Sequence, residues 1–229
     1  MITTGFSSSV TKTEIVDVAT GVTCSDLADF PVKLHGAVGA NLHGTPVVCG
    51  GYFSYSNLGY SDKCYSFTNG VWGEEFASMK DKRVYAAAIV YNKKLHVFGG
   101  DNEPSRLRTS EIINADGEVS EGPVLPTAVW KHAMTTLNDT VSILSGGWTT
   151  ANSYSAQTWY YNHETKVFTS GPNLLEGRRD HGSATNVDKV TNAKTLIVTG
   201  GLGNGYNALD STELLVNGQW QTGTPYFLI

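Results

Sequence analysis

The segment KKLHVFGGDNEPSRLRTSEII, Lys93–Ile113, is the best guide to the fold because its parts recur along the chain. It consists of a short apolar run, the glycine pair Gly99–Gly100, a polar loop and a second run that is typical of a strand. Alone, the glycine pair suits either a turn that cradles a ligand or the end of a strand. Recurrence at a regular interval favours the second interpretation, because it indicates a repeat architecture.

Paired glycines end a β-rich run at four places: Gly50–Gly51, Gly99–Gly100, Gly146–Gly147 and Gly200–Gly201. The opening MITTGF resembles a degenerate copy with Gly5–Phe6, and successive copies begin about 45 to 54 residues apart. A second strand pattern follows each pair and its loop, starting at Thr13, Asp62, Ser110, Thr158 and Thr212. After the next turn comes an aromatic or apolar residue, at Thr23 or Cys24 in the first copy and then at Trp72, Val119, Phe168 and Trp220.

A further strand pattern precedes each later glycine pair, and small residues dominate its first half. These segments start at Leu34, Val84, Lys131 and His181. Small side chains permit close backbone approach, so we expect these strands to pack tightly against their neighbours. No window shows a sustained 3.6-residue apolar period, which predicts little helix. Four short strands in roughly 50 residues are typical of one propeller blade.

The recurring unit resembles the kelch repeat, in which a strand ending in Gly-Gly is followed by a strand carrying a tyrosine and then by a tryptophan. The best matches are Gly50, Gly51, Tyr65 and Trp72, followed by Gly146, Gly147, Tyr161 and Phe168. The third copy lacks both aromatic residues, and the first lacks the second glycine. The resemblance covers essentially the whole chain. It implies an all-β, kelch-type β-propeller of four-stranded blades, a fold that binds other proteins, or sometimes glycans, through loops on one face.

We therefore expect a single domain over residues 1–229 with about five repeats, four complete and one split or incomplete. Their approximate bounds are 1–30 (repeat 1), 31–78 (repeat 2), 79–124 (repeat 3), 125–172 (repeat 4) and 173–229 (repeat 5). Five glycine strands are accompanied by only four small-residue strands. Two arrangements fit this count: a five-bladed ring in which Tyr226–Ile229 completes the first blade, or a part of a larger propeller with an open edge that could pair with another chain.

Charge and hydropathy exclude two classes of partner. The net charge is −5, only 16% of residues are charged, and no basic cluster is longer than a pair, so we expect no nucleic-acid partner. No apolar run approaches the roughly 18 to 20 residues that span a bilayer, so we expect no membrane insertion. The first ten residues lack the basic and long apolar regions of a signal peptide, so either the protein is not secreted or its leader is absent from this chain.

The three cysteines, Cys24, Cys49 and Cys64, form no C-x-x-C pair of the kind that suggests zinc or thiol redox chemistry. Three buried free thiols are one interpretation. A Cys49–Cys64 disulfide is the other, because these two residues fall on consecutive predicted strands. Asn138-Asp139-Thr140 is a glycosylation acceptor pattern in a predicted turn. Together with the low charge, these features favour an extracellular protein, with a cytoplasmic one as the alternative.

Catalytic and cofactor motifs are weak. His35, His132 and His181 are read as equivalent positions of three small-residue strands, with Tyr85 in the fourth, but no recurring carboxylate would orient them around a metal. GGLGNG, residues 200–205, lacks the last glycine and the helix of a dinucleotide-binding turn. Cys64-Tyr65 is compatible with the cysteine–tyrosine pair of galactose-oxidase-like propellers, yet neighbours on a strand point to opposite faces. We expect neither enzymatic activity nor a metal or other cofactor.

The loops after the glycine pairs are the best candidates for binding. They are rich in Tyr, Ser, Asn, Gly, Trp and Arg, a composition typical of binding loops, although solvated hairpin loops would also fit. The residues expected to contact a partner are Tyr52, Tyr55, Arg106, Arg108, Trp148 and Tyr154. The function expected is a non-enzymatic kelch-repeat binding or scaffold module that engages a protein partner through this loop face. An extracellular glycan-binding or galactose-oxidase-like propeller is the alternative.

Overall fold

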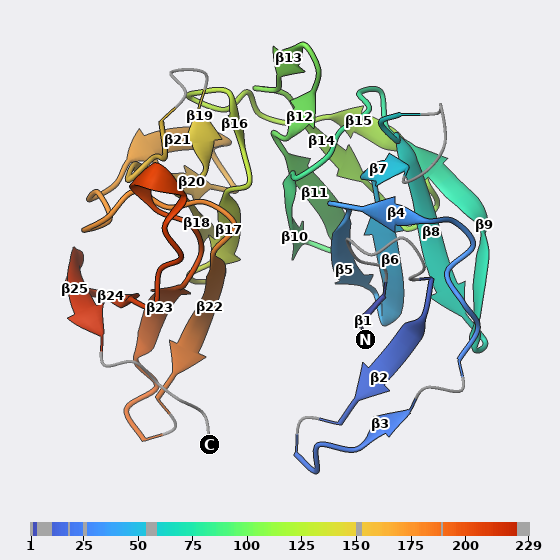
Figure 1. Ribbon diagram of the computed structural model, residues 1–229, viewed down its shortest axis with the longest axis horizontal. Helices are drawn as coiled ribbons and strands as arrows, with labels where there is room; N and C mark the ends of the chain where they lie inside the picture. Colours follow the sequence, from blue (N-terminus) through green and yellow to red (C-terminus); the bar gives the residue numbers. More distant parts are fainter. Residues whose placement is uncertain are drawn as a thin grey trace. The chain divides into compact units, whose positions relative to one another are not determined.

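The computed structural model describes residues 2–3, 11–17, 19–24, 27–53, 59–149, 153–188 and 190–223. These residues form antiparallel β-sheets, and the helix among them is a single 3₁₀ turn, η1 (Asn204–Tyr206) (Figure 1). The prediction of an all-β chain with little helix is confirmed.

Repeats 2 to 5 each form one four-stranded sheet whose strands are paired in sequence order. Repeat 2 forms β5 (Val38–Leu42), β6 (Thr45–Cys49), β8 (Lys63–Thr68) and β9 (Val71–Ser78). Repeat 3 forms β10 (Ala87–Tyr91), β11 (Lys94–Phe98), β14 (Ser110–Ile113) and β15 (Val119–Glu121). Repeat 4 forms β17 (Ala133–Thr136), β18 (Val141–Ser145), β20 (Thr158–Asn162) and β21 (Val167–Ser170). Repeat 5 forms β22 (Gly182–Val187), β23 (Lys194–Thr199), β24 (Thr212–Val216) and β25 (Gln219–Gly223).

Shorter pieces complete the architecture. Repeat 1 contributes a sheet of β1 (Ile2–Thr3), β2 (Thr13–Val16) and β3 (Thr23–Cys24). Three two-stranded ladders pair β4 (Leu34–His35) with β7 (Tyr52–Phe53), β12 (Asp101–Asn102) with β13 (Ser105–Arg106), and β16 (Val129–Trp130) with β19 (Trp148–Thr149). The predicted glycine pair Gly5–Phe6 and the predicted closing segment Tyr226–Ile229 lie outside the described residues.

The chain divides into two compact units. The N-terminal unit comprises residues 1–105 and 109–122, and the C-terminal unit comprises residues 106–108 and 123–229. In the N-terminal unit a core cluster joins the sheets of repeats 2 and 3, with members such as Val47 and Val97. In the C-terminal unit a second cluster joins the sheets of repeats 4 and 5, with members such as Ile143 and Leu215. Within each unit the two four-stranded sheets therefore bury a face against each other, as expected for repeats that cannot bury an apolar face alone.

The small-residue strands do not run unbroken from their predicted starts. Just before each main strand stands a residue in the left-handed region, with φ between 52° and 65°: Gly36, Tyr85, Lys131 and Asp180. This residue turns the chain, so that the residue before it pairs with the segment after the glycine pair, as His35 does with Tyr52. It also links neighbouring sheets: Tyr85 N–H donates to Gly36 O at 2.8 Å, and Asp180 N–H donates to Lys131 O at 3.0 Å.

The glycine pairs are fixed by backbone conformation and by close packing. All of their members have positive φ: Gly50, Gly51, Gly99, Gly100, Gly146, Gly147, Gly200 and Gly201. At Gly147 a Cβ atom would lie 2.5 Å from Val129 Cγ2 and 3.0 Å from Trp130 O. Any side chain there would push β16 away, so the pair ends the strand and lets the next segment approach.

The two repeat tryptophans connect neighbouring repeats. Trp72 Nε1 donates to Thr13 Oγ1 at 2.8 Å, and Trp220 Nε1 donates to the carbonyl of Pro172 at 3.0 Å. The cross-strand partner of Trp72 is Phe67, while Tyr65 faces Glu75 after a register shift in β8 and β9. The sequence match between Tyr65 and Tyr161 is therefore displaced: by strand pairing Tyr65 corresponds to Trp159, and Tyr161 corresponds to Phe67.

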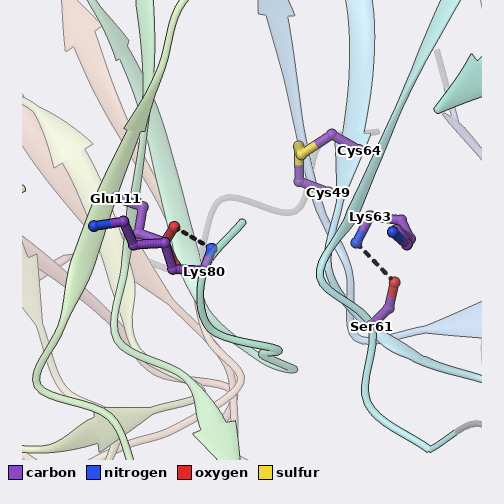
Figure 2. The surroundings of a disulfide bond; sticks show 6 residues. All are labelled: Cys49, Ser61, Lys63, Cys64, Lys80 and Glu111. Carbon is purple, nitrogen blue, oxygen red and sulfur yellow. Dashed lines mark hydrogen bonds between the residues drawn. A yellow bond between two sulfur atoms is a disulfide. The ribbon is translucent and has the colours of Figure 1, made fainter. Parts of the chain in front are cut away.

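Cys49 on β6 and Cys64 on β8 are directly opposite each other and form a disulfide (Figure 2). Both residues are buried in the core cluster of the N-terminal unit. Cys24 is a free and exposed cysteine. The interpretation of three buried free thiols is therefore wrong.

A buried ion pair recurs in repeats 3 and 5. Arg83 Nη2 lies 2.5 Å from Glu111 Oε1, and Arg178 Nη2 lies 2.7 Å from Glu213 Oε1. Each arginine also donates to the carbonyl of the first glycine of its pair, Gly99 at 2.7 Å and Gly200 at 2.9 Å. The ion pair thus links three parts of its repeat. These are the segment before the first main strand, the end of the second main strand and the third main strand.

The carboxylate of this ion pair accepts main-chain N–H groups as well. Glu111 accepts from Lys80 N at 2.6 Å, as Figure 2 shows, and from Asp81 N at 3.0 Å. Glu213 accepts from Leu175 N at 2.7 Å in the same way. Because the buried carboxylate is bonded to a guanidinium and to N–H donors, its charge is compensated.

Repeats 2 and 4 carry a different set at the same three positions. The arginine is replaced by Leu34 and Val129, and the glutamate by Tyr65 and Trp159. The residue that donates an N–H to the glutamate is replaced by Pro31 and Pro126. Proline has no N–H to satisfy, so the apolar set leaves out both the carboxylate and its main-chain donor.

Candidate binding surface

Two of the residues expected to contact a partner, Trp148 and Tyr154, lie together in the C-terminal unit. They form a group with three residues that were not expected there. We call this group the Trp148 cluster; its members are Trp130, Trp148, Tyr154, Arg179 and Tyr206.

Loop ends of repeats 4 and 5 position the members of the cluster. Trp130 on β16 is paired with Trp148 on β19, directly after the glycine pair. Tyr154 forms an isolated bridge with Trp148 on the other side. Arg179 forms a bridge with Leu202, and Tyr206 ends η1 in the left-handed conformation at φ 63°. The cluster is therefore held by main-chain pairing on both of its repeats.

Three aromatic rings surround the guanidinium of Arg179. Its Cζ lies 5.0 Å from the ring centroid of Trp148, 5.1 Å from that of Tyr154 and 5.6 Å from that of Tyr206. The rings stand at 88°, 83° and 90° to one another, so they form three perpendicular walls. Each such contact stabilises a cation by about 0.5–2 kcal/mol. The three rings therefore hold the guanidinium of Arg179 in one orientation.

The ring of Trp148 is also stacked on a second indole ring. Trp130 lies on Trp148 with 5.0 Å between ring centroids and 16° between planes. Trp130 also contacts cations: Arg106 Cζ lies 5.0 Å and Lys131 Nζ 5.3 Å from its ring centroid. Arg106, another residue expected to contact a partner, therefore joins the edge of the cluster.

Asp180 supplies a negative charge beside the cluster. Its carboxylate is paired with Arg179 and, at 3.2 Å, with Lys131. Burial lowers the pKa of Arg179, but the hydrogen bond to Tyr154 and the charge of Asp180 together raise it by more, so the pKa is raised overall. Arg179 remains a fixed positive charge at every physiological pH.

The cluster is half accessible to solvent. Arg179 is buried, Trp148 and Tyr154 are half-buried, and Tyr206 is 65% exposed. A hollow of about 400 Å³ beside Tyr154 is lined by hydroxyl and amide side chains, those of Thr127, Thr149, Ser153, Ser155 and Gln157. Rigid aromatic area next to adaptable hydrogen-bonding groups is the chemistry of a recognition surface.

The other residues expected to contact a partner do not join this cluster. Tyr52 belongs to the N-terminal unit, where it packs against His35 at 5.4 Å and Tyr60 at 5.2 Å. Arg108 is exposed, and its Nε donates to the carbonyl of Leu125 at 2.8 Å. Tyr55 lies outside the described residues.

Tyr52 nevertheless has the same place in its repeat as Trp148. Tyr52 pairs with His35 and bridges to Tyr60, as Trp148 pairs with Trp130 and bridges to Tyr154. Burial raises the pKa of Tyr60, and the charges of Asp101 and Glu103 raise it further. The position after the glycine pair therefore carries an aromatic ladder in repeats 2 and 4.

The predicted equivalence of three histidines is wrong. His132 and His181 each precede the first paired residue of a main strand, but His35 lies two positions earlier in its repeat, where repeats 4 and 5 have Trp130 and Arg179. The left-handed residue at Gly36 separates His35 from its strand. Tyr85 is the equivalent of Gly36, and Ala86 is the residue that corresponds to His132.

His132 and His181 are both sheltered from solvent. Burial, followed by the charge of the neighbouring His181, lowers the pKa of His132 to about 3. Burial, followed by the charge of Arg178, lowers the pKa of His181 to about 4. His181 Nε2 lies 3.0 Å from Ser145 Oγ, whereas both ring nitrogens of His132 are buried with no hydrogen-bond partner among the described residues. Both rings are therefore neutral at physiological pH.

Other motifs have structural roles. In GGLGNG the chain passes from the bridge at Leu202 into η1, and YNALDSTELL ends in strand β24, as predicted for a repeat loop. No group of three or more His, Cys, Asp or Glu that could hold a metal ion occurs within the described ranges. In the same part of the chain, no helix has the length and apolar character needed to cross a membrane.

Trp130, Arg179 and Tyr206 were missed because the pattern was aligned on histidines. Trp130 and Arg179 share the position directly before a left-handed residue, Lys131 or Asp180. They lie 16 and 21 residues before the first glycine of their pairs (146−130 and 200−179), so counting from the glycines does not align them. Tyr206 has no such signal, because its contact with Trp148 depends on how repeats 4 and 5 pack together.

The comparisons with known proteins identify similarity in fold alone. No family model matches the chain, and no curated protein matches it. Among solved structures, the chain is similar to one described as the structure of YjhT, with a TM-score of 0.73 at 14% sequence identity. That match covers 93% of this chain and 75% of the other. Most of the chain therefore shares an architecture with YjhT.

Proposed function

We propose that the chain is a kelch-type β-propeller that acts as a non-enzymatic binding module for a protein partner. The proposal of a propeller is supported by the four sheets of four sequential strands and by the left-handed residue and glycine pair that recur with each of them. The fold similarity to YjhT over 93% of the chain also supports it. On this proposal repeat 1 belongs to a fifth blade.

The Trp148 cluster is the observation that carries the proposal of binding. Tyr, Trp and Arg dominate the binding energy of protein interfaces, and the strongest contributors are rigid and partly buried before the partner arrives. Trp148 and Tyr154 are held by main-chain pairing and by Arg179, so they lose little freedom on binding. The exposed ring of Tyr206 offers further aromatic area to the partner.

A protein partner suits the surface better than a small ligand does. The cluster extends from Arg106 through Trp130 and Trp148 to Tyr206, along loops of two repeats. Arg179 and Asp180 add charged groups close to the aromatic rings. Aromatic residues flanked by charged and hydroxyl groups match the apolar centre and polar rim of protein interfaces.

The test is affinity capture followed by measurement with a purified partner. The chain is immobilised, captured proteins are identified, and the dissociation constant of each candidate is measured by calorimetry. We expect Trp148→Ala and Tyr206→Ala each to weaken binding by roughly 30-fold, the effect of losing a strong interface residue. Val190→Ala is the control, because Val190 is 93% exposed and lies outside the cluster. A partner that binds both cluster variants as tightly as the unchanged chain would contradict the proposal.

Glycan binding is the alternative that one observation favours. The hollow beside Tyr154 is lined by hydroxyl and amide groups, which can exchange hydrogen bonds with sugar hydroxyls. An oxidase of the galactose-oxidase type has less support, because it would need a free cysteine to join to tyrosine and Cys64 is bonded to Cys49. A glycan array probed with the unchanged chain and with Tyr154→Ala separates the two, since only glycan binding gives a signal that this variant loses.

A further inference from the structure

We propose that Asn138 is an N-glycosylation site and that its first sugar packs into the neighbouring apolar hollow of repeat 4. Asn138-Asp139-Thr140 is the single Asn-x-Ser/Thr triplet with x other than proline in the sequence. It occupies the turn between β17 and β18. This site is separate from the Trp148 cluster, so its test is independent of the proposed function.

The turn presents Asn138 in a defined orientation. Asn138 is exposed, and the side chain of Asp139 is fully exposed. Asn138 Oδ1 accepts from Thr140 N at 3.0 Å, from Val141 N at 2.9 Å and from Thr140 Oγ1 at 3.3 Å. All three bonds use the amide oxygen, and Nδ2 is the atom that takes a sugar. The hydroxyl that the acceptor triplet requires therefore already contacts the asparagine side chain.

An apolar hollow of about 570 Å³ begins at Asn138 itself. Its apolar lining comes from Leu137, Val141, Tyr160 and Val167, and it is open to solvent. Val167 is 51% exposed, so the hollow presents aliphatic surface to water. The C–H faces of a pyranose ring attached to Asn138 would cover this surface and remove it from water. Because the sugar would be covalently attached to Asn138, it is the occupant that we propose for the hollow.

The disulfide supplies independent support for the compartment. Disulfides persist in oxidising compartments such as the secretory pathway, where asparagine-linked glycans are also attached. Cys49 and Cys64 form such a bond inside the core of the N-terminal unit. The disulfide is therefore consistent with the compartment that the proposed glycosylation requires.

The reaction is a glycosyl transfer. Asn138 Nδ2 forms a bond to the anomeric carbon of an oligosaccharide carried on a lipid diphosphate. The bond between that carbon and the diphosphate oxygen breaks, and the lipid diphosphate leaves with the bonding electrons. Nδ2 loses one proton to a base of the transferase. The secretory pathway of the host supplies the enzyme and the donor.

The first experiment measures occupancy. The chain is produced behind a secretion leader in eukaryotic cells, and its intact mass is measured before and after treatment with peptide N-glycosidase. We expect one glycan on the unchanged chain and on Thr140→Ser, and none on Asn138→Gln or Thr140→Ala. A secreted chain without a glycan, or a glycan that persists in Asn138→Gln, would overturn the proposal.

The second experiment tests packing in the hollow. The glycosidase converts the asparagine to aspartate, so the treated chain is compared with Asn138→Asp as a control for the new charge. We expect the glycan to raise the melting temperature by about 2–4 °C, a shift that corresponds to about 1 kcal/mol in a chain of this size. In Val167→Ser the same glycan should raise it less. An equal melting temperature with and without the glycan would refute packing in the hollow.

Discussion

Arg178 connects three parts of repeat 5 through one side chain. It donates to the carbonyls of Gly200 and Ser211 and forms an ion pair with Glu213, and both charged groups are almost fully buried. Arg178→Met would leave the Glu213 carboxylate buried without its cation. We expect this change to lower the free energy of unfolding by about 3–5 kcal/mol, measured by urea denaturation.

The matched control for this prediction is Arg108→Met. Arg108 is exposed and its Nε donates to the carbonyl of Leu125, so its loss should cost less than about 1 kcal/mol. Equal effects of the two variants would show that the buried ion pair does not stabilise the repeat.

His132 gives the protein a dependence on pH. Its pKa is about 3 in the folded chain and close to 6.5 when unfolded, because burial disfavours the charged ring. The unfolded chain therefore binds more protons between these values, and stability falls as the pH drops through this window. His181, with a pKa of about 4, contributes in the same direction.

We expect each of these histidines to lower the free energy of unfolding by about 2 kcal/mol between pH 7.5 and pH 5. His132→Leu should remove about half of that decline while leaving stability at pH 7.5 unchanged or higher, since both ring nitrogens lack partners within the described residues. Urea denaturation at the two pH values measures both effects. An unaltered pH dependence in His132→Leu would contradict the assignment.

Strands β6 and β8 are held together by the disulfide as well as by their ladder. Cys49 and Cys64 are separated by 15 residues in sequence, and closing a loop of this size restricts the unfolded chain. We expect the double variant Cys49→Ala/Cys64→Ala to lose about 3 kcal/mol of stability. Cys24→Ala should have little effect, because Cys24 is exposed and free. If a reductant does not shift the denaturation midpoint of the unchanged chain, the disulfide is not formed in solution.

At the scale of the whole molecule, the chain passes between its two compact units more than once. Residues 106–108 belong to the C-terminal unit, while the residues on both sides of them belong to the N-terminal unit. Arg106 and Arg108 fasten this segment to Trp130 and to the carbonyl of Leu125. Unfolding of either unit should therefore disturb the other.

We expect a single unfolding transition. Trp72 is the one tryptophan of the N-terminal unit, and the other four lie in the C-terminal unit. In Trp72→Phe the fluorescence reports on the C-terminal unit alone, while circular dichroism reports on all sheets. The two signals should have the same midpoint in urea. Separate midpoints would show that the units unfold independently.

The strands could be predicted from the repeat period of the sequence. Features that depend on contacts between repeats could not be predicted. Strands starting near Thr13, Ser110, Thr158 and Thr212 follow from the residues alone, because β-branched and aromatic runs between turn signals specify strands. The histidine alignment failed because a left-handed residue occupied by Tyr85, Lys131 or Asp180 has no fixed sequence signature. The Trp148 cluster was found only in part. Arg179 and Tyr206 come from the following repeat, and Trp130 pairs with Trp148 across a turn that the sequence does not mark.

Repeats 3 and 5 carry the buried Arg–Glu pair, whereas repeats 2 and 4 carry apolar residues and a proline at the same three positions. This alternation also constrains how the sequence can evolve. Mixed sets are disfavoured: a proline at Lys80 would take an N–H from Glu111, and a leucine at Arg83 would leave that carboxylate without its cation. A repeat can pass from one set to the other only through less stable intermediates. Duplicated repeats should therefore diverge in whole sets, and the set that a repeat carries marks its line of descent.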